Sequence, residues 1–269
     1  MTAQLTSIQE LVVEIGDTPI LLRSQDERFW YIVQQRYSGF VGNGVDPALT
    51  FDVEVVDPEA SLSDGELRVW TENGFWRLER GDFRAEWDPR SGRGHILQTA
   101  TPYAIDTALR VVHTILQAPV GGFLLHGASA IRNGRAFLFS GVSGAGKTTI
   151  SRLAPNDAIL LTDEISYIRR DDSGYRACGT PFAGELARPG ENAAAPIERV
   201  YFLAKGPENS IEPMEISEAL RKLLRNILFF ADDPELVKMV FRSASQFLER
   251  VPAFRLTFYP DGRVWDLIQ

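Results

Sequence analysis

The pattern of hydrophobic and polar positions changes along the chain near residue 100. Before that point most apolar runs are short and are separated by polar turn residues, as is typical of strands. One stretch, 26–37, instead carries apolar residues at helical spacing. These residues are Phe29, Ile32, Val33 and Tyr37. Residues 1–100 are therefore predicted to form a mainly β accessory region that contains one helix.

The strands expected in this region are 11–15, 20–23, 49–56, 67–70, 75–79, 83–87 and 95–98. Asn73-Gly74, Arg80-Gly81-Asp82 and the stretch 89–94 separate the last four, and such turn residues predict an antiparallel meander. Four of the five tryptophans fall in the same region. They are Trp30, Trp70, Trp76 and Trp87. Packing within the sheet is the favoured interpretation of these side chains, and a recognition face is the alternative.

A helix is predicted from Thr101-Pro102 to Gln117, because proline suits the first helical turn and apolar residues repeat along one side. The repeating residues are Ile105, Leu109, Val112 and Leu116. Pro119 and Gly121-Gly122 end this helix. A domain boundary near residue 100 follows, with the accessory region in 1–100 and a nucleotide-binding catalytic domain in 101–269.

Two apolar strands, 123–132 and 135–140, flank Asn133-Gly134, which is the strongest short-range signal for a β-hairpin. The two strands are therefore predicted to be antiparallel. A phosphate-binding loop usually follows a strand of a parallel sheet that is reached through a crossover helix. A hairpin that leads directly into such a loop predicts a different arrangement, an α/β fold with a mixed sheet.

The second of these strands is followed by GVSGAGKT, residues 141–148, which fits a glycine, four free positions and then Gly-Lys-Thr. Backbone N–H groups of such a loop, together with the N-terminus of a helix predicted at 149–153, suit a polyphosphate anion. Lys147 would reach the β- and γ-phosphates, and Thr148 would bind Mg²⁺. ATP and Mg²⁺ are thus the expected cofactors. The residues expected to hold the nucleotide are Gly141, Ser143, Gly144, Ala145, Gly146, Lys147, Thr148 and Thr149.

The rest of the chain alternates strands, turns and helices. Strands are expected at 158–161, 165–169, 175–178 and 200–203, helices at 216–230 and 234–251, and a closing hairpin of 254–259 with 264–268 around Asp261-Gly262. The stretch 179–196 is rich in Gly, Pro and Ala, and its length favours a mobile loop that acts as a functional lid.

Candidate chemistry lies on both sides of the 141–148 motif. Asp163 and Glu164 stand at the end of an apolar strand, 16 and 17 positions after Lys147. A kinase needs carboxylates for Mg²⁺ and one that accepts the proton of the attacking hydroxyl. The hairpin would bring His126 close to the same site, where its imidazole could orient Asp163. A solvated acidic pair and a histidine with only a structural role are the alternatives.

These motifs resemble the nucleotide-binding core of the bacterial HPr kinase/phosphorylase family. The resemblance rests on His126-Gly127, the motif 141–148 and Asp163-Glu164, and it covers residues 122–202. It implies the fold of ATP-type phosphoenolpyruvate carboxykinase. It also implies that Asp163 is the general base, that His126 is its hydrogen-bonding neighbour, and that Thr148 and Glu164 lie on the Mg²⁺ side.

The chain departs from that family in two places. The family usually has Asp-Asp where this chain has Asp163-Glu164. Its Glu-x-Arg-Gly signature is matched only loosely by residues 185–190, so the resemblance does not extend to the phosphorylase reaction or to HPr as the substrate. The chain is more similar to divergent HPr-kinase-related proteins, some of which are thought to phosphorylate serine in ribosomally made peptide precursors. Glu185, Arg188 and Arg225 are candidates for contacts with phosphate or substrate.

Composition narrows the range of partners. The chain has 269 residues, a net charge of −8 and a sequence pI near 5.1, which argues against nucleic acid or an anionic membrane. The single cysteine, Cys178, cannot form an internal disulfide, and no secretory signal or apolar run of bilayer length is evident. The expectation is a cytoplasmic protein, with a homo-oligomer left open.

The sequence therefore predicts an ATP- and Mg²⁺-dependent kinase that phosphorylates a hydroxyl, above all serine of a protein or peptide partner. One alternative is a kinase for a small metabolite, which would be favoured if the strand carrying His126 ran parallel to its successor. A second alternative is a regulatory scaffold that binds ATP without transferring phosphate.

Overall fold

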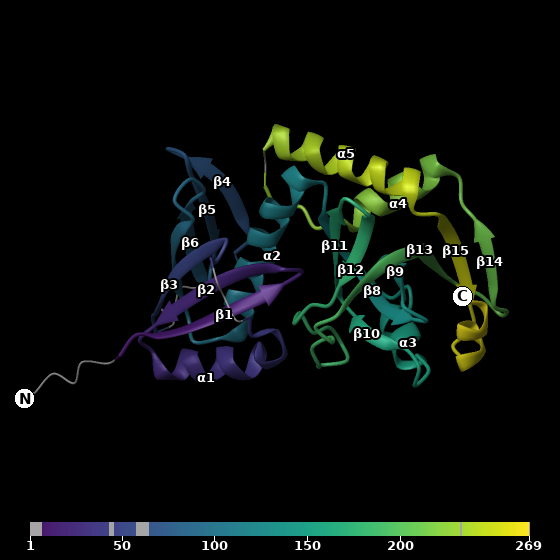
Figure 1. Cartoon of the computed structure of the whole chain (residues 1–269), viewed down its shortest axis with the longest axis horizontal. Coiled ribbons are helices and arrows are strands. Elements are labelled where there is room, and N and C mark those ends of the chain that lie inside the picture. Colours follow the sequence, from purple (N-terminus) through teal and green to yellow (C-terminus); the bar gives the residue numbers. More distant parts are fainter. Residues whose placement is uncertain (1–6, 43–45, 58–64, 232, 269) are drawn as a thin grey trace, which may run out of the picture. The chain divides into compact units, whose positions relative to one another are not determined.

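The described residues of the computed structural model, 7–42, 46–57, 65–231 and 233–268, belong to two units. The first unit comprises residues 1–112 and 230–233, and the second comprises 113–229 and 234–269. The division falls inside the helix that begins at Pro102, whereas the sequence suggests a boundary near residue 100. Each unit combines helices with a mixed sheet, so the fold is mixed α/β (Figure 1).

The first unit is built on a seven-stranded sheet of order β1-β2-β3-β7-β6-β5-β4. Its strands are β1 (Gln9–Ile15), β2 (Thr18–Ser24), β3 (Leu49–Val55), β4 (Arg68–Glu72), β5 (Phe75–Arg80), β6 (Phe83–Asp88) and β7 (Arg93–Gln98). β2, β3 and β7 run parallel, and the other neighbours are antiparallel. Asn73 and Gly74 have φ values of 52° and 84°, which an Asn-Gly hairpin turn requires. The predicted meander over β4 to β7 is confirmed.

Two helices of the first unit form where the sequence predicts them. Helix α1 (Glu27–Arg36) buries Phe29 and Val33. Asp26 caps this helix, since its side chain accepts a hydrogen bond from the backbone N–H of Phe29 at 2.9 Å. The short 3-10 helix η1 (Ser38–Phe40) follows, and helix α2 (Pro102–Gln117) has the predicted bounds.

A buried ion pair connects α1 to α2 within the first unit. Arg36 Nη2 lies 2.5 Å from Asp106 Oδ2, and the hydroxyl of Tyr37 donates to Asp106 Oδ1 at 2.6 Å. The side chain of Asp106 is only 4% exposed. Burial, reinforced by the Asp106 carboxylate, raises the pKa of Tyr37 well above its usual value. The phenol therefore stays protonated and remains a donor to that carboxylate.

Removal of this carboxylate should destabilise the first unit. Asp106→Ala leaves Arg36 and the hydroxyl of Tyr37 without their partner, and we expect the free energy of unfolding to fall by about 3 kcal/mol. Asp52→Ala is the control, since that side chain is 63% exposed and lies 3.7 Å from Arg23. It should cost less than about 1 kcal/mol. Urea unfolding followed by circular dichroism measures both, and equal losses would contradict the role given to Asp106.

The second unit is built around two long strands that each pair with several others. Its strands are β8 (Phe123–Arg132), β9 (Arg135–Ser140), β10 (Ile159–Thr162), β11 (Ile165–Asp171), β12 (Gly174–Cys178), β13 (Ala194–Lys205), β14 (Ser210–Pro213) and β15 (Ala253–Phe258). β8 pairs with β9, β10 and β11, and β13 pairs with β9, β12 and β15. Because β11 also pairs with β12, the strands β8, β11, β12, β13 and β9 form a closed cycle of pairings.

The strand β9, which leads into the loop 141–146, has one antiparallel and one parallel neighbour. We name this loop the glycine loop. β8 and β9 form the predicted antiparallel hairpin, with Asn133 and Gly134 at φ values of 52° and 73°. On its other edge β9 pairs in parallel with β13. β8, which carries His126, is antiparallel to its successor, so the strand arrangement that would favour a metabolite kinase is not the one observed here.

Helices cover both faces of these strands (Figure 1). α4 (Ile216–Asn226) and α5 (Pro234–Arg250) lie on one face, where Phe247 packs edge-on against Phe123 and Tyr175. α3 (Lys147–Arg152) and the 3-10 helix η3 (Gly262–Leu267) lie on the other, and η2 (Ala118–Val120) precedes β8. Within the described residues, no helix has both the length and the apolar character needed to cross a bilayer.

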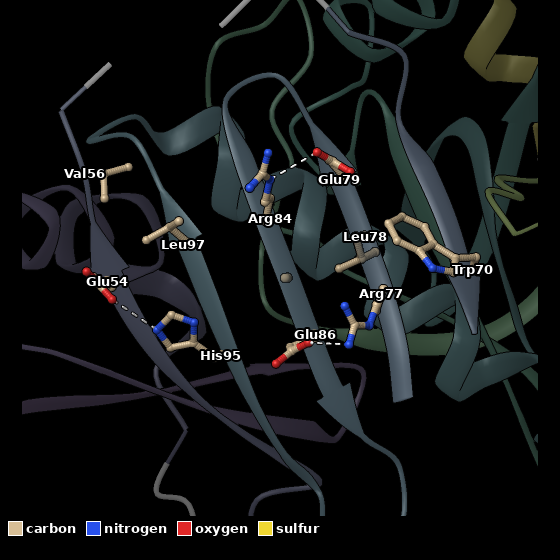
Figure 2. Close-up of a pocket in the computed structure, with 11 residues that line it drawn as sticks. Glu54, Val56, Trp70, Arg77, Leu78, Glu79, Arg84, Glu86, His95 and Leu97 are labelled. Atoms are coloured by element: carbon tan, nitrogen blue, oxygen red, sulfur yellow. Dashed lines mark hydrogen bonds and ion pairs between the residues drawn. The ribbon is translucent and has the colours of Figure 1, made fainter. Parts of the chain in front are cut away.

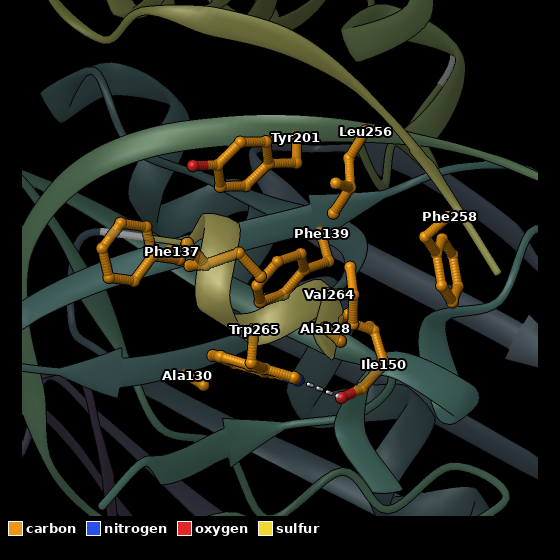
Figure 3. Close-up of a cluster of buried hydrophobic side chains, with 11 residues drawn as sticks. Ala128, Ala130, Phe137, Phe139, Ile150, Tyr201, Leu256, Phe258, Val264 and Trp265 are labelled. Atoms are coloured by element: carbon orange, nitrogen blue, oxygen red, sulfur yellow. Dashed lines mark hydrogen bonds between the residues drawn. The ribbon is translucent and has the colours of Figure 1, made fainter. Parts of the chain in front are cut away.

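A cluster of buried apolar side chains fixes α3 to the strands (Figure 3). Its members are Ala128, Ala130, Phe137, Phe139, Ile150, Tyr201, Leu256, Phe258, Val264, Trp265 and Ile268. The indole N–H of Trp265 donates to the backbone carbonyl of Ile150 at 3.1 Å. Phe139 stacks on Tyr201 and meets Trp265 edge-on. The helix that follows the glycine loop is thereby packed against β8, β9, β13, β15 and η3.

The C-terminal region differs from the prediction. Residues 264–268 are not the second strand of a closing hairpin, because η3 covers most of them. β15 already pairs with β13 on one edge and with β14 on the other. Both edges of this strand are therefore occupied by strands of the described residues. Val264, Trp265 and Ile268 are buried in the core cluster instead. β14 is not predicted by the sequence, and β13 begins at Ala194, well before the predicted residue 200.

His113, in the second unit, is a buried histidine near the end of α2. Its ring meets Tyr167 edge-on with 5.4 Å between the ring centroids. The side chain is fully buried, and neither ring nitrogen has a hydrogen-bond partner among the described residues. Burial lowers the pKa of His113 to about 3. The folded protein therefore keeps this imidazole neutral.

This histidine should make stability depend on pH. The unfolded chain binds a proton at His113 below about pH 6.5, whereas the folded chain does not until near pH 3. The contribution of neutral His113 to stability is thus fully present above about pH 6.5. It falls as the pH drops from 6.5 toward 3, by up to about 1.4 kcal/mol per pH unit. His113→Leu should flatten the fall between pH 7 and pH 5 in urea titrations. Ile115→Val, on the same helix, should lower stability without changing the slope, and an unchanged slope in His113→Leu would refute the assignment.

Candidate functional site

The glycine loop requires glycine at positions where the backbone and the packing leave no choice. Gly144 and Gly146 have φ values of 73° and 113°, a region that glycine adopts without strain. A Cβ at Gly146 would lie 2.6 Å from the ring of Phe258. Residues 142–144 are exposed. The loop is thus packed tightly on its inner side and accessible on its outer side.

Lys147 begins α3 and turns back toward the glycine loop. Its Nζ donates to the carbonyl oxygen of Gly141 at 3.1 Å and to that of Val142 at 3.4 Å. Burial lowers the pKa of Lys147, while the charges of Glu164 and Glu185 act in the opposite direction. The structure therefore brings the ammonium group into the field of two carboxylates that the sequence singles out.

Asp163 and Glu164 occupy the connection between β10 and β11, and their side chains have different surroundings. Asp163 is 2% exposed. Its Oδ1 accepts a hydrogen bond from the backbone N–H of Gly184 at 3.0 Å, and its Oδ2 accepts one from Leu186 at 2.9 Å. The side chain of Glu164 is 32% exposed. The carboxylate of Asp163 is thus held in one orientation, and that of Glu164 is more accessible.

His126 lies beside the acid pair, but its partner differs from the expected one. Strand pairing sets His126 opposite Ile165, the residue directly after the acid pair. Its Nε2 is 3.4 Å from Oε1 of Glu164. The resemblance implies Asp163 as the hydrogen-bonding neighbour of His126, and the contact that is observed is with Glu164. Asp163 is directed instead to the backbone of the segment 184–186.

The other predicted residues are brought to the site to different degrees. The two threonines that follow Lys147 lie half-buried in the first turn of α3. The charge of Glu185 acts to raise the pKa of Lys147, so Glu185 lies close to that ammonium group. Arg188 lines a depression beside the end of α3, and Arg225 is exposed near the end of α4. Within the described part of the chain, no hydrogen bond or ion pair joins either arginine to the acid pair.

The oxygen atoms near Lys147 suit a hard cation such as Mg²⁺. No group of three or more His, Cys, Asp and Glu side chains is placed to bind a metal ion among the residues that the structure describes. A Mg²⁺ ion that binds with a nucleotide needs fewer protein ligands, because phosphate oxygens and waters complete its coordination. The hydroxyl of Thr148 and the carboxylate of Glu164 are of the right chemical type to supply them.

Backbone hydrogen bonds hold the segment 179–193 against β10. The N–H of Thr180 donates to the carbonyl of Leu161 at 3.1 Å, and the N–H of Glu191 donates to that of Leu160 at 2.9 Å. A Cβ at Gly190 would lie 1.6 Å from the carbonyl oxygen of Leu161, so the two backbones are in direct contact. The composition of this segment predicts a lid. The composition does not reveal that backbone N–H groups of the segment donate hydrogen bonds to Asp163. Its frequent glycines, however, are a signal of close backbone approach.

A separate depression of about 660 Å³ lies on the exposed face of the sheet in the first unit (Figure 2). Its charged side chains largely neutralise one another. The ion pairs are Arg84 with Glu79 at 3.1 Å, Arg77 with Glu86 at 3.4 Å, and His95 with Glu54 at 3.6 Å. Trp87 is buried and stacks on Trp76, in line with the packing interpretation of the tryptophans. The site around the glycine loop is therefore the stronger candidate for chemistry.

Comparison with known proteins assigns the chain to a family. A mixed α/β unit that gathers Lys147, Glu164 and His126 around a glycine loop lies within residues 98–269. The family model described as SynChlorMet cassette protein ScmC matches these residues. The match covers more than half of the chain, which therefore belongs to the ScmC family. A search of curated proteins found no match.

At Gly184 there is no space for a side chain between the segment 179–193 and the acid pair. A Cβ there would lie 2.9 Å from Asp163 Oδ2 and 2.9 Å from both Cβ and Oε2 of Glu164. Gly184→Ala should displace either the segment 179–193 or one of the two carboxylates, and it should lower the free energy of unfolding by about 1 to 3 kcal/mol. Gly262→Ala is the matched control, because a Cβ at that position meets nothing within 4 Å. Urea unfolding compares the two, and wild-type stability in Gly184→Ala would contradict this packing.

Proposed function

We propose that the chain is an ATP- and Mg²⁺-dependent kinase that transfers the γ-phosphoryl group to a hydroxyl, specifically serine of a protein or peptide. The proposal includes a phosphoenolpyruvate carboxykinase-like core in the second unit, as the resemblance to HPr kinase/phosphorylase implies. The observation that carries it is the gathering of Lys147, Glu164 and His126 at the glycine loop, with Asp163 held in the same connection. A cation, two carboxylates and a phosphate-binding loop are the groups that phosphoryl transfer uses.

Lys147 would bind the phosphates together with the backbone N–H groups of the glycine loop. An ammonium group has three N–H donors. Two of them serve the carbonyls of Gly141 and Val142, so one donor is left for a phosphate oxygen. The exposed residues 142–144 let a ligand approach the same loop from outside. Opposite charges on the ammonium and the phosphate would then favour binding of the nucleotide.

Asp163 would act as the general base for the acceptor hydroxyl. Each oxygen of a carboxylate has two lone pairs, and the N–H groups of Gly184 and Leu186 take one on each oxygen. A lone pair therefore stays available for the proton of the hydroxyl. Because the two backbone hydrogen bonds fix the carboxylate in advance, little ordering is needed when the acceptor binds.

Glu164 and Thr148 would supply the protein ligands of Mg²⁺. When bound, Mg²⁺ neutralises charge on the β- and γ-phosphates. His126 would act on Glu164, not directly on the acceptor, since its Nε2 is 3.4 Å from the Glu164 carboxylate. In this assignment the imidazole keeps the longer carboxylate oriented, as outer partners of metal ligands commonly do.

Transfer of labelled phosphate from ATP to serine peptides tests the proposal. Asp163→Asn should lower the turnover rate by about 100-fold or more, because the base is lost while nucleotide binding is retained. Lys147→Ala should instead weaken nucleotide binding, measured by calorimetry with ATP and Mg²⁺. Asp172→Asn, an exposed carboxylate in the turn between β11 and β12, is the control and should keep wild-type turnover.

Two outcomes would count against the kinase. Undiminished transfer by Asp163→Asn would remove the assigned base. ATP binding without transfer to any acceptor, water included, would point to the regulatory scaffold instead.

A further inference from the structure

We infer that the depression beside the end of α3 binds an acidic segment of the peptide that carries the acceptor serine; the inference rests on the kinase function proposed above. This depression has a volume of about 710 Å³. Its walls are the end of α3, the stretch 154–160 and the stretch 186–193. We name it the α3 pocket.

Two segments that line the α3 pocket also lead to Asp163. Leu186 lines the pocket, and its backbone N–H donates to Asp163 Oδ2 at 2.9 Å. Ile159 and Leu160 of β10 line it as well, and β10 leads directly to the acid pair. Ile159 precedes Asp163 by four positions, which is about 13 Å along an extended strand. A peptide with its serine at Asp163 would therefore reach the pocket with residues about four positions away.

The charges of the α3 pocket are unbalanced. Arg152 and Arg188 line it, both are exposed, and neither has an ion pair with a carboxylate in the described part of the chain. Glu191 also lines the pocket, which leaves one excess positive charge. Positive charge is notable here because the chain as a whole carries a net charge of −8.

The depression on the sheet of the first unit provides the contrast. There the arginines Arg77 and Arg84 each face a glutamate of the same depression, at 3.4 Å and 3.1 Å (Figure 2). Each of those guanidinium groups is paired with a carboxylate of the chain, whereas no such pair occupies the two arginines of the α3 pocket within the described residues. Guanidinium groups bind carboxylates through paired hydrogen bonds. An Asp or Glu side chain of the peptide is thus the ligand that the α3 pocket fits.

Apolar and amide groups of the pocket suit the rest of a peptide. Ile159, Leu160 and Pro189 offer apolar surface, and the side-chain amides of Asn156 and Asn192 can bond a peptide backbone. A small anion would not need these groups. A peptide segment uses both the charged and the uncharged parts of the pocket.

Two series of peptides test the inference. In the first, serine peptides carry one Glu, Gln or Lys at each of the five positions on either side of the serine, and kcat and KM are measured with saturating ATP. We expect Glu about four positions away to lower KM by about 10-fold relative to Gln. The variants Arg152→Glu and Arg188→Glu should lose that preference. Peptides that carry Lys in place of Glu at the same position should bind these two variants again. Arg242→Glu, an exposed arginine of α5, is the matched control and should keep the preference for Glu.

The second series separates this inference from the kinase proposal. A fluorescent peptide with Ala in place of serine cannot be phosphorylated, and its binding is followed by anisotropy with and without the Glu. Binding that depends on Glu and on Arg152 supports the pocket even if no phosphate is transferred, in which case only the kinase proposal fails. Transfer to serine with no preference for Glu overturns the pocket and leaves the kinase intact. A rise in KM for ATP instead of peptide in Arg152→Glu would also overturn it, because the arginines would then serve the nucleotide.

Discussion

A buried carboxylate must have hydrogen-bond partners, and the arrangement of the site follows from how Asp163 meets this requirement. Its two oxygens accept hydrogen bonds from the backbone N–H groups of Gly184 and Leu186. If the segment 179–193 left β10, the carboxylate of Asp163 would lose these two hydrogen bonds. With Asp163 engaged in this way, Glu164 is the carboxylate that can contact His126. One local requirement thus divides two adjacent acids between two different tasks.

The glycine loop depends on a different kind of support. Val142 and Ser143 on its outer side are exposed, whereas its inner side rests on Phe258, and α3 is fixed by the buried cluster of β8, β9, β13, β15 and η3 (Figure 3). A well-packed interior resists displacement. Lys147 at the start of α3 is therefore held by the core, while Asp163 is held by hydrogen bonds. Positioned groups of this kind are what a reaction that relies on orientation needs.

Local signals in the sequence are enough to predict much of the fold. Asn133-Gly134 specifies the β8–β9 hairpin and its register, which sets Gly127 opposite Ser140, directly before the glycine loop. The separate pairing of β8 with β11 sets His126 beside the acid pair. The helices α1, α2, α4 and α5 follow from apolar periodicity. Contacts between distant segments are not predicted in this way. The parallel pairing of β9 with β13 joins residues about sixty positions apart, and nothing in either strand specifies it.

The failures have physical reasons as well. Val264, Trp265 and Ile268 fit a short strand as well as a 3-10 helix, and the outcome depends on whether β15 has a free edge. The partner of His126 depends on where Asp163 is directed. That direction is set by backbone donors, which every residue except proline carries, so residue types alone do not disclose it.

Trp265 gives the second unit an optical property of its own. The other four tryptophans fall within residues 1–112, so the indole in η3 is the only one in the second unit. It is buried, and its N–H is bonded to Ile150 of α3. Because indole emission responds to local polarity and hydrogen bonding, a shift of α3 changes the light that this residue emits. The chain thus carries an intrinsic fluorophore next to the helix that follows the glycine loop.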